Sequence, residues 1–302
     1  MSHAERDHAL LSASGAHRWL VCTPSVRLEE QFPDTTSSYA KEGTLAHEIA
    51  ELKLRKYFIE PMSQRSFSAK LNKFKKRELF QDEMLKHTDT YLEYLQSITL
   101  SFSSKPYVAV EKRVDYSAYA PEGFGTCDCI IIHGEDLYVT DFKYGKGVPV
   151  SAENNPQMKL YALGAYLEYS LLYPIKQVHL AIVQPRLDSI SEWSLSIDEL
   201  LAWGEEIKPI AQKAFNGEGE FVPGEHCKFC RAKAQCRARA EQYTALEDFK
   251  MMKPPLISNE EVGTILEKAI ALEAWVKDLK EYALAESLKG NEIPGWKAVE
   301  GR

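Results

Sequence analysis

Two short apolar runs joined by a turn are the feature that most constrains the fold of this chain. Ile130–Ile132 lead into His133-Gly134-Glu135-Asp136, and the apolar pattern resumes at Leu137. Glycine at the first of two loop residues suits a type II′ hairpin, so residue 133 is predicted to pair with residue 136. In that register Asp128 lies opposite Asp141, with Cβ atoms roughly 4.5–5.5 Å apart. The sequence therefore predicts a β-hairpin that brings two carboxylates together.

The surroundings of this pair indicate more than a solvated strand face, on which an isolated Asp-x-Lys triplet is common. Asp128 is predicted to share its face with apolar residues, where an unpaired carboxylate is costly: Ile130, Ile132, Leu137 and Val139. Cys127 and Cys129 are expected on the opposite face as small core residues. Lys143 projects from the same face as Asp141. Because like charges this close are unfavourable without a shared cation, we expect a divalent metal ion with an ammonium beside it.

Two predicted helices supply further polar side chains. Asn155-Pro156 are typical of a helix start, and the helix is expected to run from Gln157 to about Ser170, with Gln157 and Tyr161 on one face. A second helix is expected over residues 42–52. His47 lies away from its apolar stripe and is free to reach a site, although a lone histidine is often a core residue with satisfied hydrogen bonds.

These motifs together resemble a known family. Gly125 to Asp128 (Gly-x-x-Asp), Asp141 to Lys143 (Asp-x-Lys) and Gln157 to Tyr161 (Gln-x-x-x-Tyr), preceded by a helical His47, are similar to the RecB-like branch of the PD-(D/E)XK nuclease superfamily. The resemblance covers roughly residues 10–240 and is closest to a phage-borne group of unassigned function. It implies an α/β fold with a central mixed sheet of about five strands flanked by helices, as in restriction endonucleases.

The resemblance also implies roles for the metal-binding residues. Asp128 and Asp141 would bind Mg²⁺ or Mn²⁺, His47 would add a ligand, and the backbone carbonyl of Phe142 would complete the coordination. Glu111 occupies a place where the superfamily often has another acid, although a solvated strand glutamate fits its pattern equally well.

Three further residues have implied catalytic roles. Lys143 would position or activate the attacking water. Gln157 and Tyr161 would orient the site and the DNA strand.

The cysteines form a second motif. Cys227, Cys230 and Cys236 have the spacing C-x2-C-x5-C, and Cys22 lies near the other end of the chain. Four thiolates are a standard structural zinc site, with His226 as a substitute ligand. The pattern, however, resembles the iron–sulfur branch of the same superfamily, which includes AddB-type helicase–nucleases and CRISPR-associated exonucleases. That resemblance implies a [4Fe–4S] cluster joining segments about 200 residues apart.

The distribution of charge bears on the partner. The chain of 302 residues has a net charge of −7, but Glu60 is the only acid between Lys53 and Arg77, and residues 226–240 contain none. Interspersed aromatics such as Phe67 suit phosphate contacts and base stacking by DNA, although a solvated helical face is an alternative. No stretch resembles a membrane span or a signal peptide, so a cytoplasmic protein is expected.

Four regions are expected along the chain. Residues 1–105 form a helical region with Cys22 and His47 and a mobile basic loop near 60–77. Residues 106–220 form the nuclease core, with strands near 106–114, 126–133, 137–143, 178–184 and 191–195, followed by a helix that a capping box opens at Ser196 and Gly217 ends. Residues 221–245 hold the cysteines. Residues 246–302 form a helical extension, expected to be truncated, whose helix begins with a second capping box at Ser258.

These observations favour a metal-dependent deoxyribonuclease, most simply an exonuclease acting in phage DNA recombination or processing with a recombination partner protein. An endonuclease belongs to the same class. The alternative is a non-catalytic DNA-binding or recombination-accessory module that retains the fold and a structural iron–sulfur or zinc site.

Overall fold

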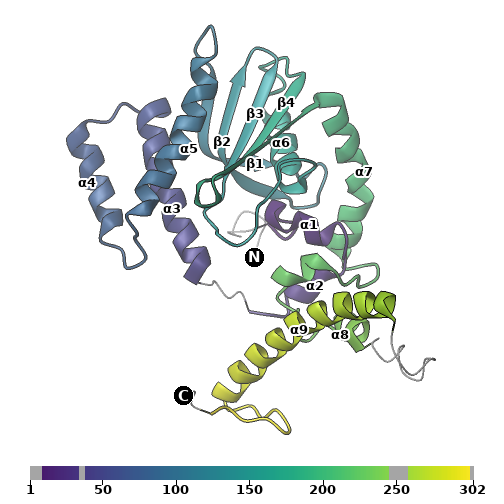
Figure 1. Cartoon of the computed structure of the whole chain (residues 1–302). Coiled ribbons are helices and arrows are strands. Elements are labelled where there is room, and N and C mark those ends of the chain that lie inside the picture. Colours follow the sequence, from purple (N-terminus) through teal and green to yellow (C-terminus); the bar gives the residue numbers. More distant parts are fainter. Residues whose placement is uncertain (1–8, 34–37, 245–257, 300–302) are drawn as a thin grey trace.

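A five-stranded mixed sheet with helices on both faces forms the centre of the molecule (Figure 1). The structure is a computed structural model that describes residues 9–33, 38–244 and 258–299. The strands are β1 Tyr107–Asp115, β2 Phe124–His133, β3 Asp136–Phe142, β4 Gln177–Gln184 and β5 Ser189–Ser196, in that order across the sheet. Only the β3–β4 pair is parallel, because the helix α6 connects these two strands. The predicted fold class is confirmed.

The β2–β3 hairpin has the register predicted from its turn. His133 pairs with Asp136, and Cys129 pairs with Thr140 at the other end of the ladder. Gly134 has φ +61°, a left-handed conformation that glycine adopts without a steric penalty. The turn therefore aligns the two strands so that the ends bearing Asp128 and Asp141 leave the ladder side by side.

The side-chain alternation of β1 and β2 reverses at one point. Val110 pairs with Cys129 and Lys112 with Cys127, but Glu111 between them has φ +49°. Such a left-handed residue interrupts the pleat. Cys129 belongs to the hydrophobic cluster that contains Phe142, and Cys127 belongs to the cluster that contains Ile130, on the other face of the sheet. The prediction that these two cysteines share a face is therefore wrong. Both are fully buried, as expected.

The first helical layer combines segments from distant parts of the sequence. It contains α6 Pro156–Tyr169, α7 Ile197–Asn216 and the N-terminal η2 Ala13–Gly15, α1 Ala16–Trp19 and α2 Ser25–Glu29. Asn155 caps α6 by accepting hydrogen bonds from the N–H groups of Gln157 and Met158. The Ser196–Glu199 capping box opens α7, and left-handed Gly217 ends it, as predicted.

The second layer covers the opposite face of the sheet. Its main helices are α3 Ser38–Leu54, which continues into the π-helical turn η3 Arg55–Ile59, and α5 Glu83–Leu100. Their buried side chains form a cluster with Phe142 of β3: Leu45, Ile49, Met84, Tyr91 and Leu95. The short η4 Pro185–Leu187 links β4 to β5.

The basic segment after α3 is helical and not the predicted loop. Helix α4 spans Gln64–Lys75, and Ser63 caps it by accepting a hydrogen bond from the N–H of Ser66. Leu71 and Phe74 are three residues apart and therefore lie on one helix face. Both pack against the cluster that contains Phe142. This short apolar stripe outweighs the repulsion between the lysines, and Figure 1 shows α4 standing beside α3.

The C-terminal part of the chain carries η5 Glu225–Phe229, α8 Arg237–Thr244 and α9 Asn259–Leu288, which begins at the predicted Ser258 capping box. Asp278 of α9 lies 2.9 Å from Lys233 Nζ and 2.6 Å from Arg239 Nη1, so α9 docks on the cysteine segment. Residues 246–257 of the predicted extension lie outside the described residues. Among the described helices none combines the length and apolarity needed to cross a membrane.

Candidate metal centre

Three side chains from three different elements converge at the end of the β2–β3 hairpin. His47 of α3, Glu111 of β1 and Asp128 of β2 each place a potential ligand atom within 4.8 Å of the others. His47 Nδ1 lies 3.3 Å from Asp128 Oδ1, and the His47 ring packs edge-on against Phe142. An imidazole nitrogen and carboxylate oxygens are ligands that Mg²⁺ or Mn²⁺ accepts.

Burial and mutual repulsion set the protonation of this group. Burial, with the Asp128 carboxylate second, raises the pKa of Glu111 to about 8. Burial alone would lower the pKa of His47, but Asp128 and the other nearby carboxylates outweigh it and raise that pKa to about 9. Burial likewise acts to raise the pKa of Asp128, and the His47 contact and the Phe142 N–H together hold it below its usual range. Without a cation the cluster therefore retains protons that a metal ion would displace.

Asp141 forms a second polar group with Lys143 and Gln157. Lys143 Nζ lies 2.9 Å from Asp141 Oδ2 and donates to Gln157 Oε1 at 3.2 Å. Gln157 Nε2 donates to Asp141 Oδ1 at 3.0 Å and lies 3.4 Å from the Tyr161 hydroxyl. Burial raises the pKa of Asp141, and this carboxylate in turn keeps the pKa of Lys143 raised despite the burial of the amine.

The two groups are adjacent, but Asp141 is not one of the three ligand atoms that meet within 4.8 Å. The β2–β3 ladder ends at Cys129–Thr140, and Asp128 Oδ2 accepts the Phe142 N–H at 2.7 Å in place of a further backbone bond. Asp141 Oδ2 is buried and makes no hydrogen bond of suitable geometry, although Lys143 is near. A buried carboxylate oxygen with this unused capacity fits a metal ligand, so the donor set suits a divalent cation.

The first glycine of the Gly-x-x-Asp motif has a steric explanation. A Cβ on Gly125 would lie 2.7 Å from Cε1 of Tyr161, closer than any carbon contact allows. Glycine therefore lets α6 approach β2, which brings Gln157 and Tyr161 to the end of the hairpin.

An arginine beyond β4, whose side chain is largely covered, contacts the residue after Lys143 and was not among the predicted residues. Arg186 lies 2.8 Å from both Glu42 of α3 and Glu83 of α5, and its guanidinium sits 4.5 Å from the centre of the Tyr144 ring. Arg186 thus holds Tyr144, the residue that follows Lys143. These three partners come from three separate segments, so no local pattern pointed to them.

Tyr91 of α5 is a second contribution that the sequence did not indicate. Its hydroxyl bonds to Thr140 Oγ1 at 2.8 Å, and its ring stacks on Phe142 with centroids 5.1 Å apart. Tyr91 therefore holds β3 in place directly beside Asp141.

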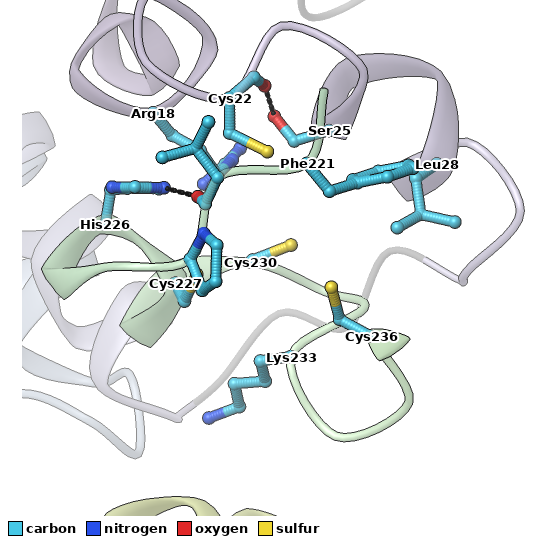
Figure 2. A pocket seen from close by; sticks show the side chains of 12 residues that line it. Arg18, Cys22, Ser25, Leu28, Phe221, His226, Cys227, Cys230, Lys233 and Cys236 are labelled. Carbon is cyan, nitrogen blue, oxygen red and sulfur yellow. Dashed lines mark hydrogen bonds between the residues drawn. The ribbon is translucent and has the colours of Figure 1, made fainter. Parts of the chain in front are cut away.

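The four cysteines predicted to act together line one cavity (Figure 2): Cys22, Cys227, Cys230 and Cys236. Figure 2 shows Cys22, Cys230 and Cys236 turned toward the same space. Burial raises the pKa of Cys22, and it raises that of Cys230 to about 12. His226 lines the cavity too, but its Nε2 donates to the Val222 carbonyl at 2.8 Å.

Hydrogen bonds around this cavity join residues 18–29 to the distant residues 215–231. Glu29 of α2 accepts the N–H of Arg231 at 2.8 Å and pairs with Arg18 at 2.5 Å. Arg27 donates to the Phe215 carbonyl at 2.7 Å, and Thr23 donates to the Glu218 carbonyl at 2.5 Å. The N-terminal helices and the cysteine segment are thus one structural unit.

Comparison with known proteins gives the family. The crystal structure of SSO0001 is similar to this chain at 14% sequence identity and a TM-score of 0.31, over 72% of this chain and 94% of that one. A TM-score this low bears on neither fold nor function. A family profile matches residues 8–302, which is nearly the whole chain. The chain therefore belongs to the family described as "Protein of unknown function (DUF2800)".

Proposed function

We propose that this protein is a metal-dependent deoxyribonuclease of the PD-(D/E)XK type. The observation that carries the proposal is the convergence of His47, Glu111 and Asp128 beside the Asp141–Lys143–Gln157 group. Strongly shifted pKa values with specific charge partners are typical of catalytic sites. Asp141 Oδ2 is buried with Lys143 Nζ as a charged neighbour at 2.9 Å and has capacity for a further ligand bond.

The residues that would hold Mg²⁺ or Mn²⁺ are His47, Asp128, Asp141 and the backbone carbonyl of Phe142, with Glu111 as a further ligand. When bound, such an ion makes water a nucleophile near neutral pH and shields the charge of a phosphate. The support for Glu111 is its position, because its carboxylate lies with His47 and Asp128 in a partly buried group.

Lys143 would act as a cation and hydrogen-bond donor. Its raised pKa beside Asp141 keeps the amine protonated at neutral pH, so it serves to orient water and offset phosphate charge. Gln157 holds both Asp141 and Lys143, and Tyr161 holds Gln157 in turn. This chain of hydrogen bonds would fix the amine relative to the carboxylate.

For the cysteines we propose a [4Fe–4S] cluster in place of zinc. The support is the C-x2-C-x5-C spacing with a distant fourth cysteine, which resembles the iron–sulfur branch of the superfamily, and the one cavity that all four cysteines line. Four thiolates are the usual ligands of such a cluster.

The test of the nuclease proposal is cleavage of end-labelled linear DNA and closed circular DNA with Mn²⁺ or Mg²⁺. Loss of the linear substrate alone indicates an exonuclease, and nicking of circles indicates an endonuclease. Asp141→Asn and Lys143→Ala are each expected to lower turnover more than about 100-fold without loss of folding, because each removes charge from the reacting centre. Asp136→Asn, at the far end of the same strand, is the matched control.

Unchanged turnover in both site variants would contradict the assignment. DNA binding by a wild-type protein that cleaves neither substrate would favour the non-catalytic accessory module, which would then act in phage recombination with a partner protein.

A further inference from the structure

An open groove lies between the end of α3, helix α4 and helix α5. Its volume is about 380 Å³, and the residues that line it come from all three helices and from the π-helical turn η3: Lys53, Lys56, Tyr57, Phe67, Leu71, Leu85, Asp89 and Leu92. That volume lies within the range of small-ligand sites in proteins. The π-helical turn is itself a feature often found at functional sites.

The floor of the groove is apolar and closed by an internal ion pair. Lys53 is buried, and its Nζ donates to Asp89 Oδ1 and to the Leu85 carbonyl, each at 2.6 Å. Lys56 Nζ sits 4.1 Å from the centre of the Phe67 ring. Tyr57 retains 48% of its surface exposed, so its ring is available to a ligand.

Helix α4, which forms one wall of the groove, is strongly cationic on its exposed surface. Helix α4 and the residues after it carry exposed basic side chains that form no ion pair within the part of the chain that the structure describes: Arg65, Lys70, Lys73, Lys75 and Lys76. Residues 61–77 contain no acid, although the whole chain has a net charge of −7. Such a concentration of positive charge on an acidic protein is complementary to a polyanion.

We propose that this groove binds single-stranded DNA, with a base stacked on Tyr57 and the phosphates on α4. An apolar groove with an exposed ring accepts an unstacked base, whereas duplex DNA keeps its bases stacked and presents phosphates. Helix α3 carries both His47 and the groove, and Lys56 lies nine residues beyond His47, which is about 13 Å along a helix axis. The inference rests on the proposed function, because it assigns the substrate of that nuclease as a single strand.

The test is binding of a fluorescently labelled oligonucleotide, as a single strand and as a duplex, measured by anisotropy in a chelator that prevents cleavage. Tyr57→Ala is expected to weaken single-strand binding about 5- to 150-fold, the usual cost of one lost stacking contact, and to change duplex binding much less. Tyr57→Phe keeps the ring and is expected to bind like the wild type. Equal losses for both substrates, or no loss for either, would overturn the proposal.

The cationic wall is tested separately. The double variant Lys70→Glu and Lys73→Glu is expected to weaken single-strand binding and to reduce its salt dependence, because two phosphate contacts are lost. Lys208→Glu with Lys213→Glu makes the same change of charge on α7 and serves as the control. Similar effects of both double variants would indicate only a general effect of net charge. That result would overturn the assignment of α4 as a binding surface.

Failure of this inference can be told apart from failure of the proposed function. If the wild type cleaves DNA but Tyr57→Ala binds a single strand as well as the wild type does, the nuclease proposal stands and the groove is not the binding site. Selective single-strand binding without any cleavage in Mn²⁺ would retain the groove and remove the nuclease. Tighter binding of single-stranded RNA than of DNA would overturn the assignment of DNA.

Discussion

At the residue scale, Glu111 shows most directly how the candidate metal centre departs from an ordinary sheet. A left-handed backbone at a residue with a side chain costs on the order of 1–3 kcal/mol, and such strain clusters at functional sites. Its carboxylate is also partly buried beside Asp128, which raises its pKa to about 8. The fold thus holds an unfavourable residue where a cation would bind.

We therefore expect Glu111→Gly to stabilise the metal-free protein while weakening Mn²⁺ binding. Glycine removes the backbone strain and the repulsion, and a net gain of about 1 kcal/mol would raise Tm by roughly 2–4 °C. Mn²⁺ affinity should fall about 10-fold or more through loss of a ligand. Thermal melting and titration calorimetry measure the two effects.

Asp188→Gly is the matched control, since Asp188 is also left-handed, with φ +46°, but is exposed and is not one of the three residues that converge. It should gain stability without a change in Mn²⁺ affinity. A Glu111→Gly protein that binds Mn²⁺ like the wild type would remove Glu111 from the ligand set.

At the scale of elements, those with a strong local signal were predicted and those stabilised by packing were not. The hairpin register followed from Gly134 and the flanking isoleucines, and α6 and α7 began at the predicted caps. Helix α4 was predicted as a loop because its basic composition hid a stripe of two apolar residues. Its helical state depends on α3 and α5, which a local pattern does not reveal.

The docking of α9 on the cysteine segment gives a prediction at this scale. Burial would raise the pKa of Asp278, but the hydrogen bonds from Arg239 and Lys233 hold it below its usual value. Asp278→Asn should release α9 and speed hydrogen exchange over Asn259–Leu288 about 5- to 150-fold, as expected for a charge-assisted bond worth about 1–3 kcal/mol. Glu273→Gln, exposed on the same helix, is the control.

The effect of Asp278 should depend on pH with a definite sign. A depressed pKa contributes stability above the unfolded value of about 3.9 and loses it as the pH falls through the lower folded value. The difference between wild type and Asp278→Asn should therefore persist from pH 8 to 5 and shrink below about pH 4. Equal exchange in the two proteins at pH 7 would show that the ion pairs do not hold α9.

At the scale of the whole molecule, the cysteine cavity connects the two ends of the described core. Cys22 follows α1, which belongs to the first helical layer. The other three cysteines lie about 200 residues later in the chain. Glu29 and Arg231 join the same two segments without any cofactor. A cluster bound here would close a loop that contains the entire sheet.

Protein purified without oxygen is accordingly expected to be brown, with bound iron and sulfide. In the chain-entropy model a cross-link over about 200 residues stabilises by about 5 kcal/mol, so Cys236→Ser should lose the cluster and melt at a markedly lower temperature. Iron analysis and calorimetry provide the measurements. Cys127→Ala, in the core, should retain iron, whereas a colourless wild type with stoichiometric zinc would contradict the cluster.

The sequence by itself determined the strands, the hairpin register and the caps, because each depends on residues close together in the chain. It also indicated the side chains at the candidate site, of which His47, Gln157 and Tyr161 do reach the end of the hairpin. Only the tertiary structure decided that Glu111 lies with His47 and Asp128, and that Arg186 holds Tyr144, the residue after Lys143. Those contacts join segments far apart, and burial sets their charges, so no local pattern contains them.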